Sequence, residues 1–115
     1  MEIKINEDHK SISTSTWQKS FNSKIEEILV FDWIVVLRFW PEENEGYARN
    51  VVALSMKDGN MIWQAPGLED PTMPLTYYME IIKTKDGKLA MSNTASWLIY
   101  VDIVTGEILR KVEIR

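Results

Sequence analysis

The sequence contains no cysteine and a single histidine, His9, and these two scarcities exclude several kinds of chemistry. Without cysteine there is no disulfide framework, no thiol nucleophile and no cysteine-ligated zinc or iron–sulfur centre. One histidine leaves little for a histidine metal site. The apolar runs are far shorter than the ~20 residues that span a bilayer, and residues 1–8 lack the apolar stretch of a signal peptide. We therefore expect a cytoplasmic protein that makes no membrane contact.

Catalytic motifs are also missing. The sequence has no P-loop, no Gly-x-Gly-x-x-Gly phosphate cradle and no Gly-x-Ser-x-Gly nucleophile elbow. Adjacent carboxylates occur at Glu26-Glu27, Glu42-Glu43 and Glu69-Asp70, but neighbours on a strand face opposite ways, so that only the loop pairs could act together. We expect no enzyme activity, no cofactor and no bound metal. A hydrolase that uses loop carboxylates is the weakest of three alternatives.

The residues that are present predict one all-β domain. The chain has 115 residues, 45% of them apolar and 26% charged, which is typical of a single soluble domain. Asp-Gly at residues 58–59 and 86–87, and Thr-Gly at 105–106, separate apolar runs and predict hairpin turns. The strand-like runs are residues 28–31, 33–40, 51–56, 61–64, 77–84, 88–92, 97–103 and 108–114.

The strand pattern repeats within the chain. Residues 51–64 lie over residues 98–111 at a constant offset, and the turn glycines Gly59 and Gly106 coincide. Glu27-Ile28-Leu29 likewise lies over Glu80-Ile81-Ile82. The repeat predicts two four-stranded antiparallel meanders, over residues 26–65 and 77–115.

The segment from Ala53 to Trp63 resembles the blade signature of quinoprotein-type β-propellers, and the segment from Val101 to Leu109 resembles it too. The resemblance covers residues 26–115 and implies blade-like sheets. Quinoprotein cofactor chemistry is not implied, because it belongs to a closed ring of many blades, and two blades cannot close a ring of about 4–8. We therefore expect a half-propeller or an open β-sandwich, or a chain that pairs with another copy.

The first 25 residues do not fit the repeat. Ile3 and Ile5 alternate as in a strand, whereas residues 11–28 are compatible with two structures. They can form an edge strand or loop, or a short helix that begins after Thr16 and presents Trp17 and Phe21 on one face. In either case we expect Trp17 and Phe21 to cover an open sheet edge.

Acidic residues are concentrated in the middle of the chain. Residues 26–80 hold ten acids and three bases, a net charge of −7, within a total of −4. Such a surface disfavours nucleic acid and suits a basic partner. In a meander, successive turns alternate between the two ends of the sheet. The tight turns should therefore share one end, and the long connections, residues 41–49 and 65–76, the other.

The long-connection end is the predicted site. Its expected partner-binding residues are Trp40, Glu42, Glu43, Glu45, Tyr47, Glu69 and Asp70. Glu26, Glu27 and Glu80 should point toward it, and Tyr77 and Tyr78 should lie nearby. Of the five tryptophans, Trp33, Trp63 and Trp97 fit the core, whereas Trp40, beside Pro41, is the best candidate for exposure.

A second resemblance bears on function. The pieces Pro41-Glu42-Glu43-Asn44-Glu45, Arg49-Asn50-Val51-Val52-Ala53-Leu54 and Gly59-Asn60-Met61-Ile62-Trp63-Gln64 resemble those of small bacterial cytosolic proteins, some of which are similar to toxin-immunity proteins. This resemblance implies an immunity protein that occludes the active site of a basic toxin, such as a nuclease. The alternative is a structural or scaffold module that forms a homodimer through open sheet edges.

Overall fold

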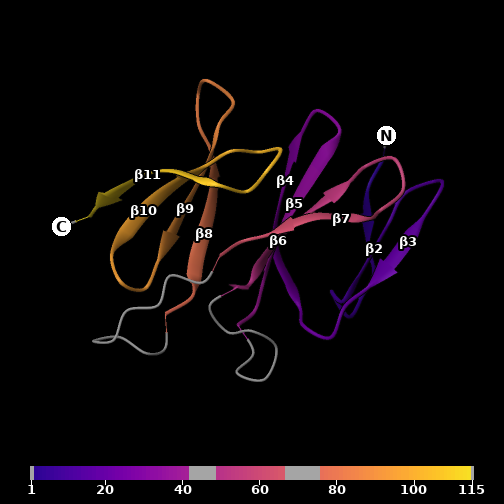
Figure 1. Cartoon of the computed structure of the whole chain (residues 1–115). Helices are drawn as coiled ribbons and strands as arrows, with labels where there is room; N and C mark the ends of the chain where they lie inside the picture. Colours follow the sequence, from indigo (N-terminus) through magenta and orange to yellow (C-terminus); the bar gives the residue numbers. More distant parts are fainter. Residues whose placement is uncertain (1, 42–48, 67–75, 115) are drawn as a thin grey trace.

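The computed structural model describes residues 2–41, 49–66 and 76–114, and within these ranges it contains eleven β-strands in three antiparallel sheets and no α-helix (Figure 1). No helix in the described part is long and apolar enough to cross a membrane. The strands are β1 (Lys4–Ile5), β2 (Ser11–Ser13), β3 (Gln18–Ser20), β4 (Ile25–Phe31), β5 (Ile34–Phe39), β6 (Val51–Ser55), β7 (Met61–Gln64), β8 (Tyr78–Lys83), β9 (Leu89–Asn93), β10 (Trp97–Val101) and β11 (Ile108–Glu113).

Two of the sheets are the predicted four-stranded meanders, β4-β5-β6-β7 and β8-β9-β10-β11, which we call the first and second blades. Residues with positive φ make their tight turns. Asp32 has a φ of 51° in the two-residue turn between β4 and β5, and Gly59, Gly87 and Gly106 lie between 76° and 79°. The prediction of an all-β, blade-like fold is therefore confirmed.

The internal repeat is reproduced in the details of both blades. The first strand of each blade carries a register shift, between Ile25 and Glu27 in β4 and between Tyr78 and Glu80 in β8. The β6–β7 pair shifts register after Ala53, and the β10–β11 pair shifts after the corresponding Tyr100. Conserving an irregularity at the same place in each repeat indicates that the bulge shapes the blade.

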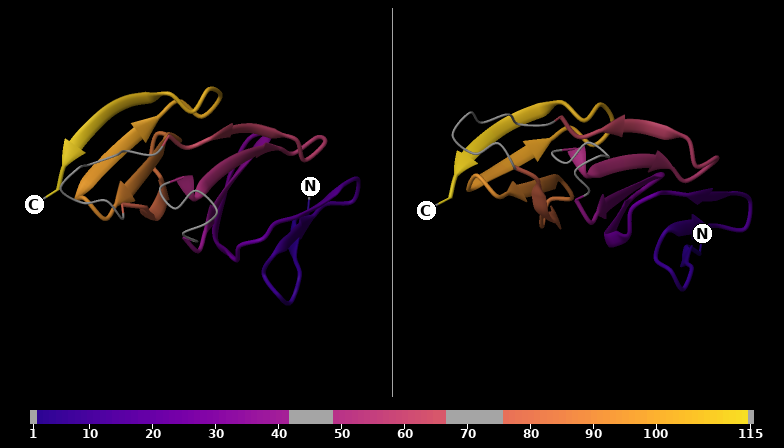
Figure 2. Two further views of the ribbon diagram at one scale, coloured as in Figure 1. Left: turned by 60° about the horizontal axis from the view of Figure 1, so that its bottom comes forward. Right: turned by 90° about the horizontal axis from the view of Figure 1, so that it is seen from below.

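The three sheets follow one another as an arc in chain order, and both faces of the first blade are covered (Figure 2). One face packs against the second blade, where Val36, Ala53 and Trp63 meet Met91 and Ile99. The other face carries Val35, Leu37 and Leu54 and packs against Ile12 of the N-terminal sheet. Alternation along β5 and β6 thus supplies two cores, which is why these strands are apolar throughout.

Tryptophan side chains join each sheet to the next. The indole N–H of Trp63, in β7, donates to the carbonyl of Ile103 at 2.8 Å, and the ring lies against Gly106 of the β10–β11 turn. The indole N–H of Trp17 donates to the carbonyl of Met56 at 2.7 Å. Its ring lies against Gly59 of the β6–β7 turn. The acceptors and glycines occupy equivalent positions of the repeat, so one type of junction is used twice.

The N-terminal segment adopts strands, so the helix considered for residues 11–28 is not formed. Strand β2 is the central strand of the sheet β1-β2-β3 and is not an edge. Trp17 covers the β6–β7 turn, and Phe21 packs on Phe39 with ring centroids 4.8 Å apart. The apolar spacing that suggested a helix face instead reflects two aromatic contacts with the first blade.

Candidate functional site

The two long connections begin and end on the same side of the blades. Phe39 and Asn50 flank the connection between β5 and β6, and Pro66 and Tyr78 flank the connection between β7 and β8. These flanking residues are hydrogen-bonded to one another. We call this side the long-loop end. Of the predicted binding residues, Glu42, Glu43, Glu45, Tyr47, Glu69 and Asp70 lie outside the described residues.

Trp40 is the one predicted binding residue that the structure describes, and 56% of it is exposed. It follows the last residue of β5, and its backbone N–H donates to the carbonyl of Lys24 at 2.8 Å. Its side chain lines two pockets, one with Phe21 and Met61 and one with Glu26 and Tyr77. An exposed indole held on a fixed backbone between two hollows is well suited to an intermolecular contact.

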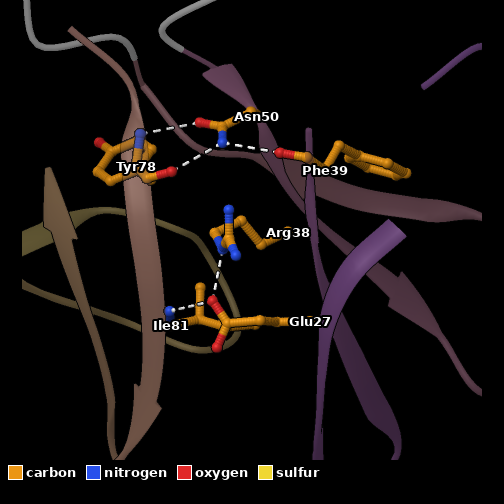
Figure 3. A network of polar contacts seen from close by, with 6 residues as sticks. All are labelled: Glu27, Arg38, Phe39, Asn50, Tyr78 and Ile81. Carbon is orange, nitrogen blue, oxygen red and sulfur yellow. Dashed lines mark hydrogen bonds and ion pairs between the residues drawn. The ribbon is translucent and has the colours of Figure 1, made fainter. Parts of the chain in front are cut away.

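Asn50 ties the long-loop end together (Figure 3). Its amide nitrogen donates to the carbonyls of Phe39 at 3.0 Å and Tyr78 at 2.8 Å, and its amide oxygen accepts the Tyr78 backbone N–H at 2.9 Å. The side chain is 6% exposed. One buried amide therefore fixes the end of β5 and the start of β8, which belong to different blades.

Strands β4 and β8, which are the first strands of the two blades, are also linked by side chains. Glu27 accepts hydrogen bonds from the Arg38 guanidinium and from the Ile81 backbone N–H, as Figure 3 shows. Lys83 donates to the carbonyl of Val30 at 2.8 Å. Edge groups that could pair with another strand are thus used within the chain. Glu27, which the sequence placed with the acidic end, lies instead between the blades, whereas Glu26 and Glu80 are exposed.

Tyr78 is buried, with 1% of its surface exposed, although the sequence suggested an aromatic near the binding surface. Its hydroxyl donates to the carbonyl of Pro66 at 2.7 Å. Burial raises the pKa of Tyr78 from 10.0 to about 12 because the phenolate would lose its hydration. The neutral phenol is the form that the fold accommodates.

This shift predicts a loss of stability in alkali. Below pH 10 the phenol is neutral in both states, and between pH 10 and about 12 only the unfolded chain ionises. The contribution of Tyr78 to the free energy of unfolding should therefore fall by about 3 kcal/mol across that window. Urea titrations of the wild type and Tyr78→Phe from pH 9 to 12 measure it. The variant should be less stable by about 1 kcal/mol at pH 9, and the two curves should converge or cross by pH 12. Parallel curves would contradict the expectation.

A pocket of about 140 Å³ lies beside Trp40, between the N-terminal segment and the first blade. Its walls are mainly apolar. Arg49 is the sole ionisable side chain among the described residues that line it, and it is exposed. The complete set of described lining residues is Phe21, Asn22, Ser23, Phe39, Trp40, Arg49, Asn50, Val52, Met61 and Gln64.

Sequence reasoning missed several residues of this end. Met61 is 49% exposed although it begins a strand, and Asn50 is buried although it ends a polar connection. Trp33, which was expected in the core, is 44% exposed in the β4–β5 turn at the opposite end, whereas Trp63 is buried. The exposure of Trp33 could have been predicted from the sequence, because this residue follows Asp32 in a two-residue turn.

Metal ligands are not gathered in the described part of the chain, where no group of three or more His, Asp or Glu side chains could hold an ion. The long-loop end instead has two hollows, the exposed ring of Trp40 and hydrogen-bonding groups.

Comparisons with known proteins support the fold. A search of curated proteins finds no match to the sequence. Among solved structures, the chain is similar to BamB from Moraxella catarrhalis, a β-propeller, with a TM-score of 0.64 and 10% sequence identity over 91% of this chain and 31% of that chain. It therefore spans about a third of the length of that relative. At this identity the likeness establishes a propeller-like fold. The family model described as "Domain of unknown function (DUF7957)" matches residues 1–112, and the chain belongs to that family.

Proposed function

We propose that the chain is a protein-binding module whose partner surface is the long-loop end. The observation that carries the proposal is Trp40, an indole that is 56% exposed on a backbone held by β5. Between Pro41 and Arg49 the sequence adds Glu42, Glu43, Glu45 and Tyr47, and the second long connection adds Glu69 and Asp70. Aromatic anchors among carboxylates suit a basic protein surface.

The concrete form of the proposal is an immunity protein that neutralises a basic toxin, such as a nuclease. The glutamates of residues 42–45 would take the place of substrate phosphates, and Trp40 would be buried in the interface. Long-range attraction would accelerate association, and burial of the aromatic ring would slow dissociation.

A scaffold that self-associates is the alternative, and one observation favours it. The outermost strand of the second blade exposes Leu109 and Val112, and Ile114 beyond it is also exposed. Contact through these residues would be apolar. Dimerisation should then depend on protein concentration and be insensitive to salt.

Affinity capture followed by a binding measurement tests the proposal. The wild type should retain a basic protein from a lysate of the source cell at low salt and lose most of it at about 0.5 M salt, where the Debye length is only a few ångströms. With that protein purified, the triple variant E42K/E43K/E45K should bind at least about a hundredfold more weakly, and Trp40→Ala at least about tenfold more weakly. If the partner is a nuclease, adding the wild-type chain should abolish its activity.

The matched control variant changes the net charge by the same amount, at residues outside the long-loop end. Glu2, Glu7 and Glu107 are exposed and lie outside the long-loop end, so E2K/E7K/E107K should keep most of the affinity. Equal losses for both triple variants would reduce the effect to overall charge and remove the proposed surface. Capture of the same proteins by all variants would also contradict the proposal.

A further inference from the structure

The pocket beside Trp40 has properties of a ligand site that are independent of any partner protein. The pocket is partly open to solvent, and its volume of about 140 Å³ is close to that of an enclosed apolar cavity of about 150 Å³ that accommodates benzene. Phe21 and Phe39 are in ring contact in its wall, and Met61 lies at the exposed side. Methionine sulfur and aromatic edges both pack favourably on a ring. The size and the walls fit one six-membered aromatic ring.

The described residues that line this pocket carry a charge opposite to that of the whole chain. The whole chain carries −4, yet none of the described residues that line the pocket is acidic and Arg49 is the ionised one. Among the described residues, no ion pair is formed by Arg49, whose backbone carbonyl accepts a hydrogen bond from Gln64 at 3.0 Å. A guanidinium beside an apolar hollow attracts a carboxylate and can bind it through two hydrogen bonds.

From the size, the aromatic wall and the one cation among the described lining residues, we infer that this pocket binds an aromatic carboxylate: one ring in the hollow, with its carboxylate at Arg49. Two kinds of ligand carry an aromatic ring and a carboxylate at this spacing. One is a free aromatic acid of the phenylpropionate type, and the other is a peptide that ends in a phenylalanine with a free carboxylate. The pocket shares Trp40 with the proposed partner surface, but its test uses small probes and no protein partner, so the inference can fail while the proposed function stands, and the reverse.

Titration of the full-length, isotope-labelled chain with matched probes tests the inference. 3-Phenylpropionate should shift the backbone amide resonances of Phe21, Asn50 and Val52. 3-Phenylpropan-1-ol, with the same ring and reach but no charge, should bind the same residues about fivefold more weakly, as expected for the loss of one partly exposed ion pair. N-Acetyl-Gly-Gly-Phe and its C-terminal amide form the second pair of probes. Binding of the acid peptide alone assigns the site to a chain end, and binding of the small acid alone assigns it to a free metabolite.

Two variants separate the contribution of the carboxylate contact to binding from that of the aromatic ring. Arg49 is exposed, so Arg49→Met should fold normally and lose the preference for the acid, binding 3-phenylpropionate and the alcohol with equal affinity. Met61→Ala should weaken both probes by about threefold while keeping the preference for the acid. Arg110→Met, at an exposed arginine of the second blade, is the control and should change nothing at the pocket. Equal affinity of acid and alcohol for the wild type, or resonance shifts confined to other regions, would overturn the inference.

Discussion

Replacing Gly106 by alanine should lower the free energy of unfolding by about 3 kcal/mol. Its φ of 76° is costly for any residue with a Cβ, at about 1 kcal/mol. A Cβ built there would also lie 2.7 Å from the Trp63 ring, which is buried and held by its bond to Ile103. Overpacking against a ring that cannot move adds about 2 kcal/mol. Urea denaturation followed by circular dichroism measures the loss, and the fluorescence of Trp63 should change with it.

Gly87→Ala provides the matched control. Gly87 has nearly the same φ, 79°, but a Cβ there meets nothing within 4 Å. It should cost only the backbone strain, about 1 kcal/mol. If the two variants were equally destabilised, the contact between Trp63 and the β10–β11 turn would contribute little to the junction between the blades.

Asn50→Leu should be at least as damaging, with a loss of about 4 kcal/mol. Leucine has a similar volume but leaves the Tyr78 N–H and the carbonyls of Phe39 and Tyr78 without their partner. Each buried polar group left unpaired costs about 1–3 kcal/mol. Chemical denaturation measures the stability, and hydrogen exchange at the Tyr78 amide should accelerate by several orders of magnitude.

Asn50→Asp tests the same site with a smaller change in shape. The carboxylate can still accept from the Tyr78 N–H, but it faces two carbonyl oxygens to which it cannot donate. Asn60→Ala, at an exposed asparagine in the β6–β7 turn, is the control and should stay within about 0.5 kcal/mol of the wild type. A cost at Asn50 no larger than this would show that solvent or neighbouring groups replace the amide.

The sequence predicts the parts of the fold that depend on local patterns, namely turn residues and the internal repeat. Gly59 and Gly106 mark turns because positive φ demands glycine, and the constant offset between the two blades places their strands and even their bulges. Ile3 and Ile5 indicate the first strand, but the pattern of residues 11–28 does not distinguish strands from a helix. Strands β2 and β3 have three residues each, too few to show alternation, and Trp17 and Phe21 are spaced as on a helix face. Contacts with Met56 and Phe39, far along the chain, decide between the two.

The site was predictable to a smaller extent. Exposure of Trp40 followed from its place at the end of a strand before proline, and the grouping of the long connections followed from the alternation of turns. The sequence does not predict the pocket, because it joins Phe21, which follows β3, to Met61 and Val52 of the first blade. Asn50 was hidden for the same reason, since its partner Tyr78 is 28 residues away and belongs to the other blade.

The tryptophan junctions have a consequence for how the molecule opens. The N-terminal segment and the first blade each place a tryptophan ring on a turn of the sheet that follows. Contacts between sheets therefore contribute to stability as well as contacts within them, as in a chain of nearest-neighbour units. The first blade has a neighbour on both faces, whereas the N-terminal sheet and the second blade each have one. Local unfolding should therefore proceed inward from the two ends of the arc. The first blade opens last, because exposing it requires that both junctions be broken.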